Sequence, residues 1–82
     1  QKGQMPETVE SIFIDIEQES IPITNLLKEA NMIASVSEGV RLIKQGGIKI
    51  NSTKVEDAKL VIDKGSEAVY QVGKRKFLKI KL

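Results

Sequence analysis

The sequence predicts an α+β fold in which two short helices pack on a small, mostly antiparallel sheet. Between residues 24 and 45, apolar residues recur at helical spacing, and small polar residues stand where each helix would begin. From residue 48 onward, apolar and polar residues alternate, which is typical of half-buried strands. The length of 82 residues leaves room for one small domain, with or without a linker.

An acidic lead-in over residues 1–23 is predicted to precede a domain over residues 24–82. The lead-in holds one base and five acids (net charge −4), whereas the rest holds twelve bases and six acids (net charge +6). Residues 1–11 are polar and contain one proline, as in a linker. Three isoleucines alternate with other residues over 12–17, which favours a short strand there, although Phe13 among the polar positions leaves a helix open.

The first helix is expected to run from Thr24, a candidate N-cap, to about Asn31. Its apolar stripe would consist of Leu26, Leu27 and Ala30. These three side chains lie within one helical face and predict contact with the core.

The second helix is expected to begin after Ser35, which forms a capping-box pattern with Glu38, and to end near Gln45 at a double glycine. A glycine inside a helix costs roughly 1 kcal/mol relative to alanine, so Gly39 indicates close approach to the first helix. The expected core face consists of Val36, Val40 and Ile43, with Leu42 beside it. The expected solvent face carries Arg41, Lys44 and Gln45.

Beyond the double glycine, the chain is predicted to form strands separated by turns at residues 51–53, at residues 64–65 and after Gly73. The residues expected to point inward are Ile48, Ile50, Ala68, Tyr70, Val72, Leu78, Ile80 and Leu82. Lysines alternate with them and are expected to face water.

Cations supply the candidate functional residues, because bases on adjacent elements suit a phosphate backbone. The candidate RNA-binding residues are Arg41, Lys44 and Gln45 on the second helix, Lys49, Asn51 and Lys54 around the first hairpin, and Lys74, Arg75, Lys76, Phe77 and Lys79 in the tail. Phe77 could stack on an exposed base, or residues 12–16 could cover it. Each group also has a simpler interpretation, as a solvated helix face or as lysines that protect an edge strand.

Several function classes are disfavoured by what the chain does not contain. It has no histidine and no cysteine, which are the usual metal ligands, nucleophiles and general bases, and its carboxylates follow no converging pattern. We therefore expect no catalytic residue, no metal site and no cofactor in this chain.

No apolar run is long enough to cross a membrane, and a cytoplasmic setting is expected, with an organellar one as the alternative. The first residue, Gln1, suggests a piece of a longer protein.

Residues 24–82 resemble the S-four type of RNA-binding domain, whose fold contains an alpha-L motif. The matching residues are the Leu26-Leu27 pair, Ser35, the run Arg41-Leu42-Ile43-Lys44, the run Gly47 to Asn51, and the Lys54-Val55 step. The resemblance implies RNA binding. Where this family usually has cations or alanine on the second helix, the chain has Val36, Gly39 and Val40, which shifts the expected contacts toward Lys49, Lys54 and the tail.

A narrower resemblance links the segments IKQGGIKIN and VGKRKFLKIKL to the C-terminal end of bacterial-type tyrosyl-tRNA synthetases. It implies a domain that grips tyrosine-specific tRNA near the variable arm and anticodon stem. Aminoacylation, with ATP and magnesium, would belong to the catalytic domain of the parent ligase, which would be a homodimer through other domains. The alternatives are a ribosome-associated factor, an rRNA pseudouridine synthase, or a protein-interaction appendage that has lost RNA binding.

Overall fold

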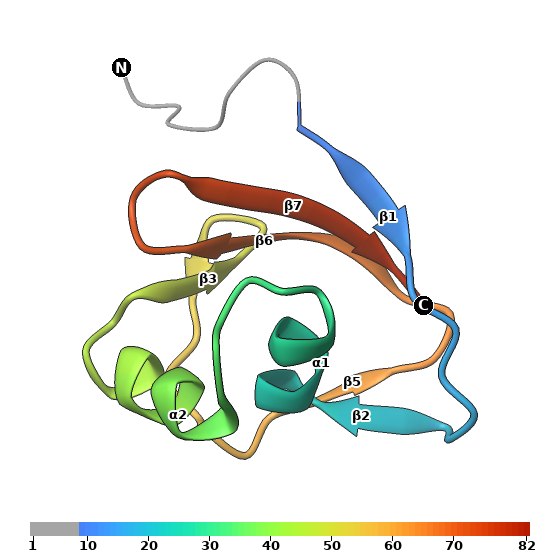
Figure 1. Cartoon of the computed structure of the whole chain (residues 1–82), viewed down its shortest axis with the longest axis horizontal. Coiled ribbons are helices and arrows are strands. Elements are labelled where there is room, and N and C mark those ends of the chain that lie inside the picture. Colours follow the sequence, from blue (N-terminus) through green and yellow to red (C-terminus); the bar gives the residue numbers. More distant parts are fainter. Residues whose placement is uncertain (1–8) are drawn as a thin grey trace.

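Two short helices lie on one side of a five-stranded sheet, which confirms the predicted α+β class (Figure 1). The structure is a computed structural model that describes residues 9–82. The elements are β1 (Ser11–Phe13), β2 (Ser20–Pro22), α1 (Ile23–Glu29), α2 (Val36–Lys44), β3 (Ile48–Ile50), β4 (Thr53–Lys54), β5 (Val61–Asp63), β6 (Glu67–Val72) and β7 (Lys76–Lys81). The main sheet has the order β1-β7-β6-β3-β4, and β2 pairs with β5 in a separate antiparallel ribbon.

The strand predicted over residues 12–17 is shorter and begins one residue earlier, at Ser11. In β1, Ile12 pairs with Ile80 in parallel register, and the backbone N–H of Ile14 still bonds Lys81 at 2.9 Å. The strand ends at Phe13 because β7 itself ends at Lys81, which removes the ladder partner. The linker predicted over 1–11 lies mostly outside the described residues, and the division at residue 23 stays a prediction.

The start of α1 differs from the prediction, because Pro22 and not Thr24 is the N-cap residue, and Pro22 supplies no side-chain bond. The N–H of Ile23 instead donates to the carbonyl of Leu60 at 2.9 Å, so a neighbouring segment satisfies this helix end. Thr24 lies inside the first turn and is 4% exposed. The helix ends at Glu29, two residues before the expected Asn31.

The capping pattern predicted for α2 is confirmed. The Ser35 Oγ atom accepts from the N–H of Glu38 at 3.1 Å, and the Glu38 carboxylate accepts from the N–H of Ala34 at 2.7 Å. The side chain therefore reaches one residue further back than in the usual capping box. At the other end, Gly46 adopts a φ of +77°, as expected for the left-handed residue that ends a helix.

The buried face of α2 is rotated from the predicted one. Gly39 and Ile43 are buried, whereas Val36 is 37% exposed and Val40 is half-buried. A Cβ atom at Gly39 would lie 2.7 Å from Ile33 Cδ1 and 3.0 Å from Thr24 Cγ2. The predicted close approach at Gly39 is thus confirmed, and it turns the helix so that the glycine, and not Val36, faces α1.

The core lies between the helices and the sheet, and the period-two pattern predicted its sheet side. Leu26 and Leu27 of α1 are fully buried, as are Ile48, Tyr70 and Ile80 of three adjacent strands. Antiparallel pairing places Ile50 opposite Tyr70 and Tyr70 opposite Leu78, so one continuous apolar face meets the helices.

Tyr70 gives the domain an expected loss of stability at high pH. Burial raises the pKa of its phenol from 10.0 to about 12, so the folded state holds this proton more tightly than the unfolded chain. The protonated phenol therefore adds its full share to the free energy of unfolding below pH 10. This share is lost as the pH rises toward about 12. Urea unfolding should show a steeper decline over this range for the parent chain than for Tyr70→Phe. Parallel declines would contradict this assignment.

Candidate nucleic-acid interface

Three candidate RNA-binding residues lie at the C-terminal end of α2: two cations and the polar residue that caps the helix. Arg41, Lys44 and Gln45 are all exposed. Arg41 and Lys44 occupy the last turn, where positive charge also interacts favourably with the helix dipole. Because residues three apart lie on one helical face, both cations can contact the same stretch of a phosphate backbone.

The hairpin between β3 and β4 is held by Asn51. This residue and Ser52 have φ values of +50° and +73°, the conformation that a two-residue type I′ turn requires. The Asn51 N–H donates to the Val69 carbonyl at 2.8 Å, and its Oδ1 accepts from the Val69 N–H at 2.9 Å. The structure thus gives Asn51 a role in fixing the hairpin on β6; its predicted RNA contact stays a prediction.

Lys54 of the same hairpin reaches the end of α2. Measured from the position that a Cβ would occupy on Gly46, the Lys54 Cδ atom is 3.2 Å away and its Nζ atom 3.8 Å away. The glycine therefore leaves space for the lysine chain to pass across the helix stop. As a result, Lys54 joins Lys44 and Gln45 at one end of the molecule.

The hairpin between β6 and β7 is tied to the same place. The N–H of Gly73 donates to the carbonyl of Gly47 at 2.8 Å. Lys74 and Arg75 form the turn that follows, and Lys76 begins β7. Three segments far apart in the sequence thus converge around the double glycine, at the left of Figure 1. We call this cluster the basic end; its members are Arg41, Lys44, Lys54, Lys74, Arg75 and Lys76.

A row of side chains continues from the basic end across the outer face of the sheet, which is the face turned away from the helices. The strand register places Lys49 opposite Lys54 on one side and opposite Gln71 on the other, and Gln71 opposite Phe77. Phe77 is half-buried, and β1 pairs with β7 only from Lys79 onward. Sequence reasoning missed Gln71, although its alternation with buried Tyr70 and Val72 indicated this face.

Lys79 stands apart from the other predicted contacts. It lies two residues beyond Phe77 along β7, and its Nζ atom is 3.4 Å from a carboxylate oxygen of Glu67. Both side chains are nearly half exposed, so this pair contributes little stability but partly neutralises the lysine. Lys79 is therefore a weaker candidate for a phosphate contact than the basic end.

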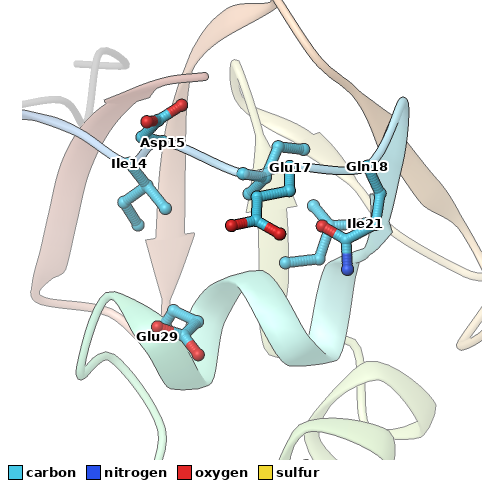
Figure 2. Close-up of a pocket in the computed structure, with 7 residues that line it drawn as sticks. Ile14, Asp15, Glu17, Gln18, Ile21 and Glu29 are labelled. Carbon is cyan, nitrogen blue, oxygen red and sulfur yellow. The ribbon is translucent and has the colours of Figure 1, made fainter.

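Acidic side chains gather around the segment that follows β1. A shallow pocket of about 320 Å³ lies between the segment after β1 and α1, and Figure 2 shows Asp15, Glu17 and Glu29 around it. No basic residue lines this pocket, but the Lys64 ammonium donates to the carbonyl of Ile16, a lining residue, at 2.7 Å. The acidic pocket and the basic end thus lie in different parts of the molecule, and a polyanion would be attracted most strongly to the basic end.

Other kinds of site have little support in the described part of the chain. Within residues 9–82, no group of three or more acidic, histidine or cysteine side chains is placed to hold a metal ion. Neither described helix is both long and apolar enough to span a bilayer.

A small α+β framework with cations gathered at one end defines a module that can hold a nucleic-acid backbone by charge. Residues 21–67 match the S4 domain family, and the chain belongs to this family. The match covers the last two residues of β2, both helices, β3 to β5 and the first residue of β6, which confirms the resemblance predicted from the sequence.

Curated relatives extend the similarity to nearly the whole chain. The chain is 56% identical over 81 residues to tyrosine–tRNA ligase 2 of Pseudoalteromonas translucida. It is 51% identical over 80 residues to the tyrosine–tRNA ligase of Colwellia psychrerythraea, and 50% identical over 80 residues to that of Francisella tularensis. These alignments cover 98% of the chain but only a fifth of each relative (20%, 20% and 19%).

Proposed function

We propose that this chain is the tRNA-binding domain of a tyrosine–tRNA ligase, located at the C-terminal end of the parent protein. It would grip tyrosine-specific tRNA near the variable arm and the anticodon stem, and so support aminoacylation in the parent's catalytic domain. The observation that carries this proposal is the basic end, where six cations from three segments surround the double glycine. Similarity to three tyrosine–tRNA ligases supports this parent over other proteins with an S4 domain.

Binding would rest on contacts between the cations and RNA phosphates. Each phosphate that a lysine or arginine neutralises releases counterions, which makes affinity fall as salt concentration rises. The acidic pocket beside α1, with Asp15, Glu17 and Glu29, would disfavour RNA on that side of the helix.

Within this proposal, the chain contributes position and affinity but no catalytic group. ATP, magnesium and the bond-forming residues would belong to the catalytic domain of the parent, which we propose to be a cytoplasmic homodimer assembled through other domains. The lack of histidine and cysteine in the chain supports this division of labour, because these residues supply most nucleophiles and near-neutral bases.

Arg41→Ala tests the contribution of α2. We expect it to weaken tRNA binding by about 1–2 kcal/mol, since arginine can hold a phosphate through two hydrogen bonds, and each single lysine substitution by less. Arg41 is exposed, so the unfolding midpoint should not change. The measurement is a filter-binding titration of a tyrosine tRNA transcript, with Lys59→Ala, also at an exposed position, as the matched control. Equal affinities for Arg41→Ala and Lys59→Ala would move the proposed site away from α2.

A further inference from the structure

Phe13 is a large aromatic side chain that the fold leaves in water. It is 62% exposed, whereas its neighbour Ile12 faces the core beside Ile80. Phe13 lies on the outer face of the sheet, on the edge strand β1 at the top right of Figure 1. Packing in the described structure therefore gives no account of an aromatic residue at this position.

The surroundings of Phe13 form a site with polar groups of both kinds. A pocket of about 290 Å³ is lined by Ser11, Ile12, Phe13, Glu67, Lys79 and Lys81. In the strand register, Phe13 lies opposite Lys81 and Ser11 lies opposite Lys79. Lys81 thus lies beside Phe13, Lys79 pairs with the Glu67 carboxylate at 3.4 Å, and the Ser11 hydroxyl stands nearby as a hydrogen-bonding group.

We infer that this pocket binds an unpaired nucleotide, whose base stacks on Phe13 while Lys81 contacts its phosphate. Stacking on an aromatic ring and a cation beside it are the two features by which proteins hold single-stranded RNA. Ser11 and Glu67 can hydrogen-bond the edge of the base. The inference deepens the proposed function, on which it rests, by adding a contact to unpaired RNA.

Charge on this sheet face favours RNA as the occupant over an apolar protein surface. The register places Lys49, Lys54, Lys79 and Lys81 on the outer face, with Glu67 as the acid beside the pocket. An apolar partner seated on Phe13 would have to desolvate the flanking lysines, which is costly, whereas a phosphate would pair with them.

The pocket is separate from the basic end. Phe13 is aligned with Lys81, five residues beyond Lys76 of the basic end on β7, and a strand rise of about 3.3 Å per residue puts these two positions roughly 16 Å apart. The residues that line the pocket, apart from Glu67, also lie outside the segment that matches the S4 domain family. A single strand could therefore pass from the basic end along the sheet to Phe13.

Three variants of the full chain test the inference: Phe13→Ala, Phe13→Trp and, as a control, Val61→Ala. Val61 is 50% exposed on β5 in the other sheet, so it matches Phe13 as an exposed apolar residue at a different place. The probes are a single-stranded RNA of ten nucleotides, the same RNA as a duplex, and a tyrosine tRNA transcript, each titrated at fixed low salt.

We expect Phe13→Ala to weaken binding of the single-stranded RNA by about tenfold and to leave binding of the duplex unchanged within about twofold. Phe13→Trp should retain affinity, and its indole fluorescence should be quenched by the single strand. Equal single-strand affinity for Phe13→Ala and Val61→Ala would overturn the inference. A sedimentation change on Phe13→Ala without any effect on RNA binding would also overturn it, by assigning Phe13 to a protein interface. If the parent chain binds neither tRNA nor the oligonucleotides, the proposed function itself fails.

Discussion

Gly39→Leu is expected to destabilise the domain by about 3 kcal/mol, the largest loss of stability that we predict for a single substitution outside the apolar core. A Cβ alone at this position would approach Ile33 Cδ1 to 2.7 Å and Thr24 Cγ2 to 3.0 Å, so a leucine has no space without separating α1 from α2. Both helices cover the same core, and a domain this small has little stability to spare. Urea unfolding followed by circular dichroism measures the loss.

Two controls separate overpacking from a general effect of leucine on the helix. Ser37→Leu places the same side chain at an exposed position of α2 and should change stability by less than about 0.5 kcal/mol. In Gly39→Ala, a gain in helix propensity of about 1 kcal/mol opposes the clash, so its loss should be smaller than that of the leucine variant. If Gly39→Leu unfolds at the same urea concentration as the parent chain, the close approach at Gly39 does not exist in solution.

Lys74→Glu combined with Arg75→Glu is expected to weaken tRNA binding more than any other pair of substitutions, by about 100-fold or more at low salt. The change places two negative charges in the hairpin turn that the Gly73–Gly47 bond holds against the end of α2. It removes two cations and also repels phosphates from the neighbouring ones. The slope of log affinity against log salt should become shallower by about two, as for two lost phosphate contacts.

The matched control for this pair is Lys28→Glu with Lys59→Glu, which changes the net charge equally at exposed positions outside the basic end. It should lower affinity only through the net charge, by a few-fold, and should leave the salt slope nearly unchanged. Equal losses for the two pairs would mean that net charge, and not the basic end, governs binding. If the hairpin pair abolishes binding while Arg41→Ala has no effect, the sheet edge is the site and α2 is not.

The sequence predicted the fold where a local pattern carries the information. The Ser35–Glu38 cap, the left-handed stop at Gly46 and the alternation around Tyr70 all depend on neighbours in the chain, and all three are present. The strands β2 and β5 were not predicted as a pair, because three residues each give no measurable alternation.

Errors arose where a distant segment decides the local structure. Thr24 was expected to cap α1, but the Leu60 carbonyl takes that role for Ile23 from 37 positions away in sequence. Val36 was expected in the core, but the contact between Gly39 and Thr24 rotates α2 and leaves the valine exposed. Such contacts cannot be obtained from periodicity, which records only that one face of a helix is apolar.

For the candidate site too, the residue types could be predicted from the sequence, but their arrangement in space could not. Cations can be found by residue type, so Arg41, Lys44 and Lys54 were identified without a structure. Their gathering depends on two tertiary features, the passage of the Lys54 chain across Gly46 and the bond from Gly73 to Gly47. Lys79 is not part of this cluster, because it lies further along β7, where it pairs with Glu67.

The most direct test of the account is a titration of the unmodified chain with a tyrosine tRNA transcript over a range of salt concentrations. If the basic end neutralises about four to six phosphates, binding should be detectable at low salt, and the slope of log affinity against log salt should be roughly −3 to −5. No binding at low salt, or a slope near zero, would contradict the account and would favour a protein-interaction role for this domain.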